Sequence, residues 1–498
     1  MNVNPITRLD YPDPDVIRVE DTYYMVSTTM HFMPGCEILQ SFDLVHWEHA
    51  TYVYETLDHT DAQQLKSGQN IYGQGMWAAS LRYHEGRFYI CFVANDTRKT
   101  YLYTSEKIDG PWKKQLIEGF YHDGSLLFDE DGRNYIVYGN DEIWITELNE
   151  DLTAPKKDGL HRLLVSDHKN PKLGYEGSHI QKINGYYYIF LIHSLRDRWM
   201  RTEACFYSDS LEGEFTGGDV LCDDRGYCGQ GVAQGGIVDT PDGKWYAMLF
   251  QDSGAVGRLP ILLPVTWKDH FPVFGQNGHV PEEIEVHSTR PGYIYQPLVG
   301  SDDFCNGLLP RWQFNHDPDP RYYHLDALQG TYTITTREVC TELTQAVNTL
   351  TQRMSYPSCA AEVTVDASAL KEGDVAGLCA LQGCYAAVGI TKHHGKYEVL
   401  MLDKKEDGIL DMTEGTVVES HQMDFRLEAD FCNMKDEARC YYRVNKGDWL
   451  PIGTVHKLYF KLDHFTGCRF GLFCYAAEET GGSACFRDFK YYDVDEIS

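Results

Sequence analysis

The stretch YHDGSLLFDEDGRNYIVYGN, residues 121–140, contains the signals that decide the fold. Asp123 stands at the head of an apolar run, and a second apolar run begins at Tyr135, after the dipeptide Asp131-Gly132. Asp-Gly is a strong signal for a tight hairpin turn, because both residues tolerate positive φ. The stretch therefore predicts two antiparallel strands joined by a turn, with a charged residue at the entrance that would be costly to bury.

The same pattern of strand, turn and strand occurs five times in the first part of the chain. The segments begin at Asp13, Trp77, Asp123, Glu176 and Gln234, roughly 46 to 64 residues apart. In four of them a glycine preceded by Glu, Asp or Asn lies nine residues after the start, and Thr22 takes that place in the first. Strand-favouring aromatic residues come shortly after the turn. A repeat of this length predicts a five-bladed β-propeller over residues 1–298, with five unrelated hairpins in a sandwich as the alternative.

The pattern changes near residue 300, where turn residues and a tryptophan interrupt the repeats in PLVGSDDFCNGLLPRW, residues 297–312. Beyond it, apolar and polar residues alternate in segments such as TYTITT (331–336) and CAAEVTVDA (359–367). A period of two indicates half-buried strands, and helical periodicity is scarce. The sequence therefore predicts a second all-β domain, residues 299–498, that forms a β-sandwich of the jelly-roll, concanavalin-like type.

Charge and cysteine content narrow the range of partners and compartments. The net charge of −30 argues against nucleic acid and anionic membranes as partners, although it could also serve solubility alone. The fifteen cysteines show no CxxC pair and no recurring zinc-ligand spacing, which favours reduced thiols. The N-terminal residues lack an apolar signal segment and the longest apolar runs are too short to cross a bilayer, so we expect a cytoplasmic protein.

If five blades surround one channel, the first residue of each repeat lies near the mouth of that channel. Equivalent positions on the innermost strands then meet at one mouth, and three of them are acids: Asp13, Asp123 and Glu176. Carboxyl groups that share a pocket differ in proton affinity, so one can serve as an acid and another as a base. Such a pair hydrolyses glycosidic bonds, and nearby aromatic rings suit a sugar. Each acid taken alone would be a turn or capping residue, and a hard-cation site needs more oxygens than these three supply.

At these residues the chain resembles glycoside hydrolase family 43, the five-bladed-propeller β-xylosidases and α-L-arabinofuranosidases. The matching motifs are YPDPDVIRVEDTYYMVST, GMWAASLRYHEGRFYI, HDGSLLFDEDGR, YEGSHIQKINGYYY and GGIVDTPDGKWY. The region from Asp302 on, with LLPRWQFNHDPDPRYY and NTLTQR, is similar to the C-terminal sandwich carried by one branch of the family. The resemblance covers nearly the whole chain and implies a hydrolase that inverts the configuration of the sugar.

The resemblance also implies a role for each acid. Asp13 matches the general base, Glu176 the general acid, and Asp123 the third acid, which raises the proton affinity of the general acid and orients it. Inversion requires room for a water molecule, so the carboxyl groups of Asp13 and Glu176 should lie about 6.5–9.5 Å apart. Arg258 matches an arginine that binds sugar hydroxyls. Trp77 and Phe32 are expected to line the same subsite, with ordinary core packing as the alternative for both rings.

One position departs from the family pattern. Many members carry a histidine at the head of the fifth repeat, near a calcium ion in the channel, and this chain has Gln234 there. An amide oxygen can also serve a hard cation, directly or through water. The resemblance therefore implies a structural Ca²⁺ in the propeller channel, with Gln234 as a candidate ligand.

These observations favour an exo-acting enzyme over two other kinds of protein. A non-catalytic sugar-binding propeller would be expected to lack one of the three acids, and a protein-interaction scaffold would present an apolar face instead of acids. The predicted substrates are short xylo- and arabinoxylo-oligosaccharides, from which the enzyme releases D-xylose and/or L-arabinofuranose. The motifs do not separate these two sugars, and the sequence leaves the oligomeric state open.

Overall fold

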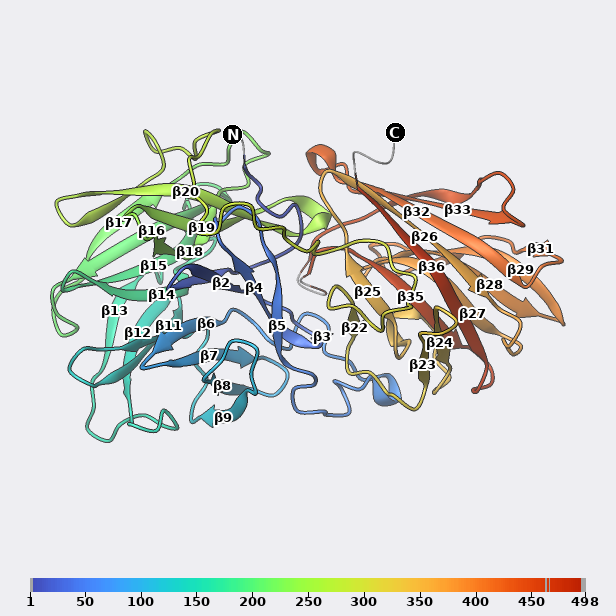
Figure 1. Ribbon diagram of the computed structural model, residues 1–498, viewed down its shortest axis with the longest axis horizontal. Helices are drawn as coiled ribbons and strands as arrows, with labels where there is room; N and C mark the ends of the chain where they lie inside the picture. The colour runs from blue at the N-terminus through green and yellow to red at the C-terminus, as the bar shows by residue number, and fades with distance from the viewer. Residues whose placement is uncertain (1–2, 462–463, 465, 494–498) are drawn as a thin grey trace.

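The computed structural model describes residues 3–461, 464 and 466–493, which form two all-β domains that lie side by side (Figure 1). A ring of five four-stranded sheets makes the N-terminal domain, and two larger sheets make the C-terminal domain. The fold predicted from the sequence, a five-bladed propeller followed by a β-sandwich, is confirmed. No helix in the described ranges is both long and apolar enough to cross a membrane.

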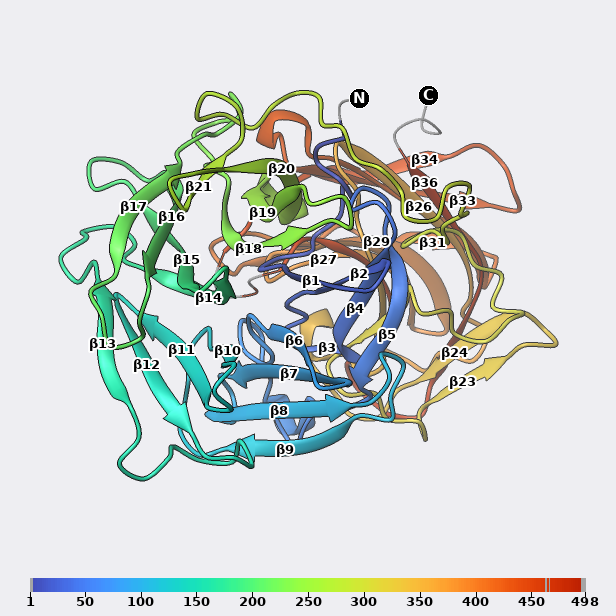
Figure 2. The same cartoon turned by 60° about the vertical axis from the view of Figure 1, so that its left-hand side comes forward.

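Each blade is one antiparallel sheet, and its first strand lies next to the central channel (Figure 2). Blade 1 contains β1 (Asp15–Val19), β2 (Thr22–Val26), β4 (Gly35–Ser41) and β5 (Glu48–Tyr54). Blade 2 contains β6 (Ser80–His84), β7 (Arg87–Ala94), β8 (Lys99–Ser105) and β9 (Lys113–Ile117). Blade 3 contains β10 (Ser125–Phe128), β11 (Asn134–Asn140), β12 (Glu142–Leu148) and β13 (His161–Ser166). Blade 4 contains β14 (Glu176–Ile183), β15 (Tyr186–Ser194), β16 (Arg201–Ser208) and β17 (Thr216–Leu221). Blade 5 contains β18 (Ala233–Asp239), β19 (Trp245–Asp252), β20 (Arg258–Lys268) and β21 (Phe271–Phe274).

Tight turns with left-handed residues close the hairpins that the sequence predicts. In blade 4, Ile183 pairs with Tyr186 across Asn184 and Gly185, whose φ angles are 51° and 85°. The same geometry closes blade 2 at residues 85–86, with φ angles of 48° and 78°. Positive φ at both central residues gives a turn whose twist matches that of the flanking strands. The turn residues therefore fix the register of the inner hairpins of blades 2 and 4. In blades 3 and 5 the inner strands pair across five-residue loops, 129–133 and 240–244, in which Gly132 and Gly243 have positive φ.

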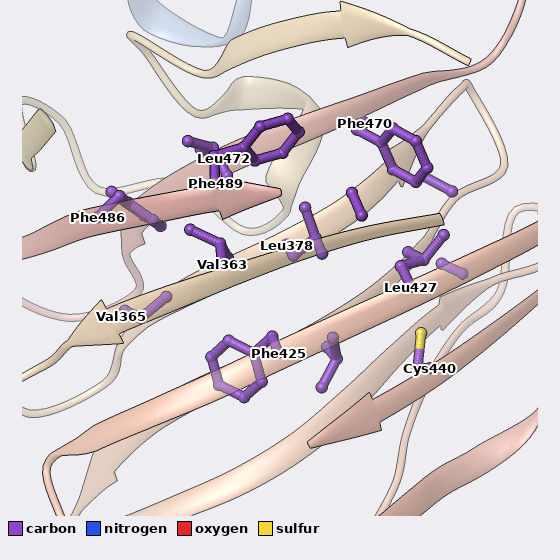
Figure 3. Packing of buried hydrophobic residues seen from close by; sticks show 14 of the residues in the cluster. Val363, Val365, Leu378, Phe425, Leu427, Cys440, Phe470, Leu472, Phe486 and Phe489 are labelled. Atoms are coloured by element: carbon purple, nitrogen blue, oxygen red, sulfur yellow. The ribbon is translucent and has the colours of Figure 1, made fainter. Parts of the chain in front are cut away.

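The C-terminal domain encloses its core between two sheets. One sheet runs in the order β3 (Phe32–Met33), β22 (Gln313–Asn315), β25 (Leu350–Arg353), β35 (Arg469–Ala476), β27 (Asp374–Leu381), β28 (Ala386–His393), β29 (Lys396–Lys404) and β30 (Leu410–Met412), and β31 (Thr416–Val418) also pairs with β29. The other runs in the order β23 (Tyr323–Asp326), β24 (Thr331–Thr335), β36 (Ser483–Asp493), β26 (Ser358–Asp366), β32 (Gln422–Asp430), β33 (Glu437–Val444) and β34 (Leu450–Lys457). Inward-facing side chains such as Leu378, Phe425 and Leu472 are completely buried between the sheets (Figure 3). In β33 buried residues alternate with more exposed ones, which explains the period of two there. Every residue of β27 and β35 is buried, because a second cluster of apolar residues packs on the other face of these strands.

Four short 3₁₀ helices complete the described secondary structure. They are η1 (Lys66–Gly68), η2 (Gly254–Val256), η3 (Leu343–Gln345) and η4 (Cys432–Met434). The last blade strand ends at Phe274 and β22 begins at Gln313, so the boundary between residues 298 and 299 stays a prediction.

The two domains share a sheet and a buried polar interface. Strand β3 comes from the propeller part of the chain but pairs with β22 of the sandwich, where Phe314 faces Met33. Next to it, Arg353 of the sandwich forms an ion pair of 2.9 Å with Glu37 of blade 1, and both side chains are buried. Arg353 also stacks on the Tyr11 ring at 4.1 Å and donates a hydrogen bond of 2.9 Å to the Asp10 carbonyl. A buried pair with these additional contacts strongly favours one docking geometry.

Candidate active site

The three acids at the heads of the repeats lie at the same end of the propeller channel. Asp13 precedes β1, Asp123 precedes β10, and Glu176 begins β14, so blades 1, 3 and 4 each contribute one carboxyl group. Asp13 and Asp123 have left-handed backbones, with φ angles of 53° and 48°. Aspartate tolerates this conformation better than most residues, and such strain is common at functional sites. The strand ends thus turn the carboxyl groups toward a common mouth.

Asp13 is held by hydrogen bonds from two directions. Thr28 Oγ1 donates to Asp13 Oδ2 at 2.6 Å, and Arg258 Nη1 donates to Asp13 Oδ1 at 2.8 Å. Arg258 begins β20 in blade 5, and its own backbone N–H donates to Asp10 Oδ1 at 2.7 Å. The structure therefore brings the predicted base and the predicted sugar-binding arginine into direct contact.

Asp123 and Glu176 are joined by a residue between them, His122. The Nε2 atom of His122 lies 3.4 Å from Asp123 Oδ2 and 3.8 Å from Glu176 Oε2. The backbone N–H of Gly177 donates to Asp123 Oδ2 at 3.0 Å, and Asn140 Nδ2 donates to Glu176 Oε2 at 2.9 Å. These contacts fix the position of both carboxyl groups from backbone and side-chain donors of blades 3 and 4.

The electrostatics of this cluster set His122 apart from its neighbours. Burial alone would lower the pKa of His122, but the charges of Asp123 and Glu176 raise it to about 9. Burial raises the pKa of Asp123, the cationic His122 opposes that rise, and the like charges of Glu176 and Asp13 add to it, which brings it to about 6. At neutral pH the site therefore holds a cationic histidine between two acids.

The glycine beside Glu176 is required for two reasons. Gly177 has a φ angle of 65°, and a Cβ atom at this position would lie 2.8 Å from Cδ of Gln234. Gln234 is buried, and its backbone N–H donates to Glu203 Oε2 at 2.7 Å. Gln234 therefore packs behind the acid and supports the backbone that carries it.

A guanidinium group fills the channel one layer below the acids. Arg82 Nη1 forms an ion pair of 2.8 Å with Asp15 Oδ2, and Arg82 Nε donates to the Leu126 carbonyl at 2.8 Å. Further donated bonds reach Ser125 Oγ, at 2.7 Å, and the Ile180 carbonyl, at 3.2 Å. Arg82 thus binds oxygens from blades 1, 3 and 4 that would otherwise suit a hard cation. The donor set in this layer does not fit a Ca²⁺ ion, whereas Gln234 lies behind Gly177 in the layer of the acids, so its assignment as a calcium ligand stays a prediction.

Comparison with known proteins identifies the family. The model of glycosyl hydrolases family 43 matches residues 3–272, and that of the beta xylosidase C-terminal concanavalin A-like domain matches residues 301–492. The chain belongs to glycosyl hydrolase family 43. It is a glycosidase, and its sandwich is the concanavalin A-like domain that accompanies the propeller in beta xylosidases.

Several relatives of this family 43 glycosidase extend over its whole length. A beta-xylosidase from Formosa agariphila is 26% identical over 99% of this chain and 89% of its own length. A xylosidase/arabinosidase from Butyrivibrio fibrisolvens is 24% identical over 99% of both chains. A solved structure of a bifunctional GH43-CE protein from Bacteroides eggerthii superposes with a TM-score of 0.92 and 42% identity, and it covers 99% of this chain. The present chain spans 64% of the length of that protein.

Of the two rings expected to line the sugar subsite, only Trp77 lies beside the acids. Its ring is 5.8 Å from that of His122, in an edge-on arrangement, and the side chain is partly exposed. The prediction for Phe32 is wrong. Phe32 is completely buried in β3, its ring is covered by the Arg469 guanidinium at 3.5 Å, and it packs among core residues of the sandwich. The pairing of β3 with β22 draws this ring into the domain interface, and no local sequence signal announces that long-range contact.

Sequence reasoning also missed residues of the family 43 site that only the fold brings together. His122 and Asn140 come from the two ends of the blade 3 hairpin. Arg201 forms an ion pair of 2.7 Å with Asp252, which in turn lies 3.4 Å from Arg258. The repeat offset could have indicated His122, because it directly precedes a repeat head, but the others have no equivalent in neighbouring repeats.

The sandwich domain also reaches this site. Phe460 packs against the Arg258 guanidinium at 5.6 Å, and the backbone N–H of Gly467 donates to Asp10 Oδ2 at 2.8 Å. Asp10 accepts from the Arg258 backbone as well, so one buried carboxyl group connects Arg258 with the second domain. The position of Arg258 therefore depends on correct docking of the two domains.

Proposed function

We propose that this family 43 glycosidase is an exo-acting, inverting enzyme that releases D-xylose and/or L-arabinofuranose from short xylo- and arabinoxylo-oligosaccharides. The observation that carries the proposal is the convergence of Asp13, Asp123 and Glu176 at one mouth of the channel. The relatives named beta-xylosidase and xylosidase/arabinosidase support the choice of sugars.

In the proposed reaction each acid has one task. Asp13, oriented by Thr28 and Arg258, takes a proton from the water that attacks the anomeric carbon. Glu176, oriented by Asn140, gives a proton to the oxygen of the leaving sugar. Asp123 and His122 set the charge around Glu176, and Trp77 forms part of the wall. Arg82 supplies a positive charge in the channel, where it balances the Asp15 carboxylate.

A leaving-group comparison tests the role of Glu176. In Glu176→Ala the hydrolysis of xylobiose should fall by about 10²–10⁴-fold, the typical contribution of a positioned proton donor. Hydrolysis of 4-nitrophenyl β-D-xyloside or 4-nitrophenyl α-L-arabinofuranoside should fall less, because 4-nitrophenolate leaves without protonation. Glu214→Ala is the matched control, since Glu214 is exposed in the loop that follows β16, at the far end of the same blade.

The results separate the possible outcomes. Equal losses on both kinds of substrate would reject the acid role of Glu176. Wild-type protein that binds xylo-oligosaccharides but hydrolyses neither glycoside would reject the enzyme proposal.

We also propose a reducing, cytoplasmic environment for this glycosidase. No disulfide links cysteines in the part of the chain that the structure describes, and ten of the fifteen are buried. A direct check is to titrate the thiols of the unfolded protein after it has been purified without reductant.

A further inference from the structure

The loop of residues 195–200 lies at the same end of blade 4 as Glu176. In blade 4, Glu176 pairs with Ile192 near the end of β15, and Ser194 pairs with Arg201 at the start of β16. The connection between β15 and β16 therefore leaves the blade at the same edge as Glu176. Any group that it presents outward lies at the rim of the mouth into which a substrate enters.

This loop presents a tryptophan to solvent on a fixed support. Trp199 is 47% exposed, while its neighbour Met200 is buried. The backbone N–H of Leu195 donates to the Met200 carbonyl at 3.0 Å, which closes the loop on itself. Arg196 forms an ion pair with Asp167 and donates to the Lys169 carbonyl at 3.0 Å. An exposed ring held in this way is ordered before any ligand arrives, so little conformational entropy is lost on binding.

A continuous chain of charged groups connects this ring with the base. The Arg201 guanidinium lies 5.7 Å from the Trp199 ring and forms the 2.7 Å ion pair with Asp252. Asp252 lies 3.4 Å from Arg258, and Arg258 binds Asp13 at 2.8 Å. Arg201 Nε is also buried without a hydrogen-bond partner among the described residues. The Trp199–Arg201 pair therefore belongs to the site and not to a remote surface.

We propose that Trp199 and Arg201 bind the sugar unit on the leaving-group side of the cleaved bond. The C–H face of a pyranose ring stacks on an exposed indole, and the guanidinium offers donors to its hydroxyl groups. Because the nearby Asp252 balances the charge of Arg201, the pair suits a neutral sugar such as a xylose unit rather than an acidic one. This inference rests on the proposed function, because it assigns the second sugar position to the same site.

The proposal makes Trp199 a determinant of oligosaccharide preference. A substrate with a sugar as its leaving group gains the stacking contact, and a substrate with a leaving group of one atom does not. Loss of the ring should therefore weaken the enzyme toward xylobiose relative to β-D-xylopyranosyl fluoride. The ratio of the two kcat/KM values measures this contact separately from the chemistry that both substrates share.

The experiment compares Trp199→Ala, Trp199→Phe and Tyr83→Ala with the wild-type enzyme. We expect the ratio of kcat/KM for xylobiose to that for the fluoride to fall about tenfold in Trp199→Ala, as stacking on one ring typically contributes. Trp199→Phe should restore most of the ratio. Tyr83 is exposed to a similar degree, 44%, but lines the opposite end of the channel, so Tyr83→Ala should leave the ratio unchanged.

The outcomes decide between the subsite and a purely structural loop. An unchanged ratio in Trp199→Ala, or an equal loss on both substrates, overturns the proposal. Failure of the proposed function gives a different result, because the wild-type protein then hydrolyses neither xylosides nor arabinofuranosides. Calorimetry still tests the inference in that case: Trp199→Ala should weaken binding of xylobiose but not of xylose, and equal effects on both sugars would overturn it.

Discussion

His122 shows how one side chain determines the charge balance of the acids it contacts. It lies between Asp123 and Glu176, and its pKa is raised to about 9. At neutral pH it therefore places a positive charge next to the proposed proton donor. Asp123, on the other side, contributes a negative charge over the pH range above its pKa of about 6. The two neighbours act on Glu176 with opposite signs.

Opposite shifts of the pH profile are therefore expected from two variants. The profile of kcat/KM should be bell-shaped, with its acidic limb set by Asp13 and its alkaline limb by Glu176. Asp123→Asn removes a negative neighbour, so Glu176 loses its proton more readily and the alkaline limb moves to lower pH. His122→Gln removes a positive neighbour, so the alkaline limb moves to higher pH. Rates on an aryl xyloside or arabinofuranoside measure both, and a common direction of shift would contradict the assignment.

At the scale of a strand, Arg82 connects the inner strand of blade 2 with the inner strands of three other blades. Burial alone would raise the pKa of Asp15, but Arg82 and His179 lower it to about 2, so the carboxylate stays charged in the channel. One side chain of β6 thereby holds oxygens from β1, β10 and β14. The guanidinium group of Arg82 therefore holds the inner strands of the propeller together at the centre of the ring.

Loss of this cation should destabilise the whole propeller. Arg82→Met leaves the Asp15 carboxylate buried without its main partner, which typically costs about 3–5 kcal/mol. The control is Arg87→Met on the next strand, because the pair of Arg87 and Glu106 is exposed and should contribute about 1 kcal/mol or less. Urea unfolding measures the free energy of unfolding of both variants.

A chelator should change neither the melting temperature nor the activity of the wild-type enzyme, and a loss that Ca²⁺ restores would contradict the role given to Arg82.

The elements differ in how far the sequence predicted them, for a physical reason. The turn at Asn184-Gly185 is encoded by the residues that form it, so the hairpin and its register could be predicted locally. Asp13, Asp123 and Glu176 could be predicted because repetition converts sequence position into position around an axis. Arg82 and Arg201 have no such signal, since their partners lie on other blades. Phe32 was misplaced because its environment comes from a domain that begins more than 250 residues later.

At the scale of the whole molecule, three histidines meet where the domains dock. The ring of His31 lies 4.8 Å from that of His316 and 5.1 Å from that of His464, and all three are buried. Burial lowers the pKa values of His31 and His316 well below the usual value and that of His464 to about 3. These rings are therefore neutral in the folded protein, whereas the unfolded chain protonates them near pH 6.5.

This interface should weaken in acid. Because the folded-state pKa values are lowered, the full stability is present above pH 6.5 and falls as the pH decreases toward about 3. Each buried histidine contributes a slope of about 1.4 kcal/mol per pH unit in that range. His31→Phe should reduce the slope by the contribution of one histidine, about 1.4 kcal/mol per pH unit. His168→Gln, on an exposed loop, should leave the slope unchanged. Unfolding free energies between pH 7 and 4 measure the slope, and identical slopes in wild type and His31→Phe would refute the argument.

The pairing of β3 with β22 limits how the gene for this protein can recombine. A gene fragment that ended after blade 5 would encode a ring with an open sheet edge and with Glu37 buried opposite a missing arginine. Recombination that swapped either half for a distant homologue's would break the same seam. Selection should therefore keep both halves together as one unit, and laboratory chimeras should take the whole segment from β3 to Arg353 from a single parent.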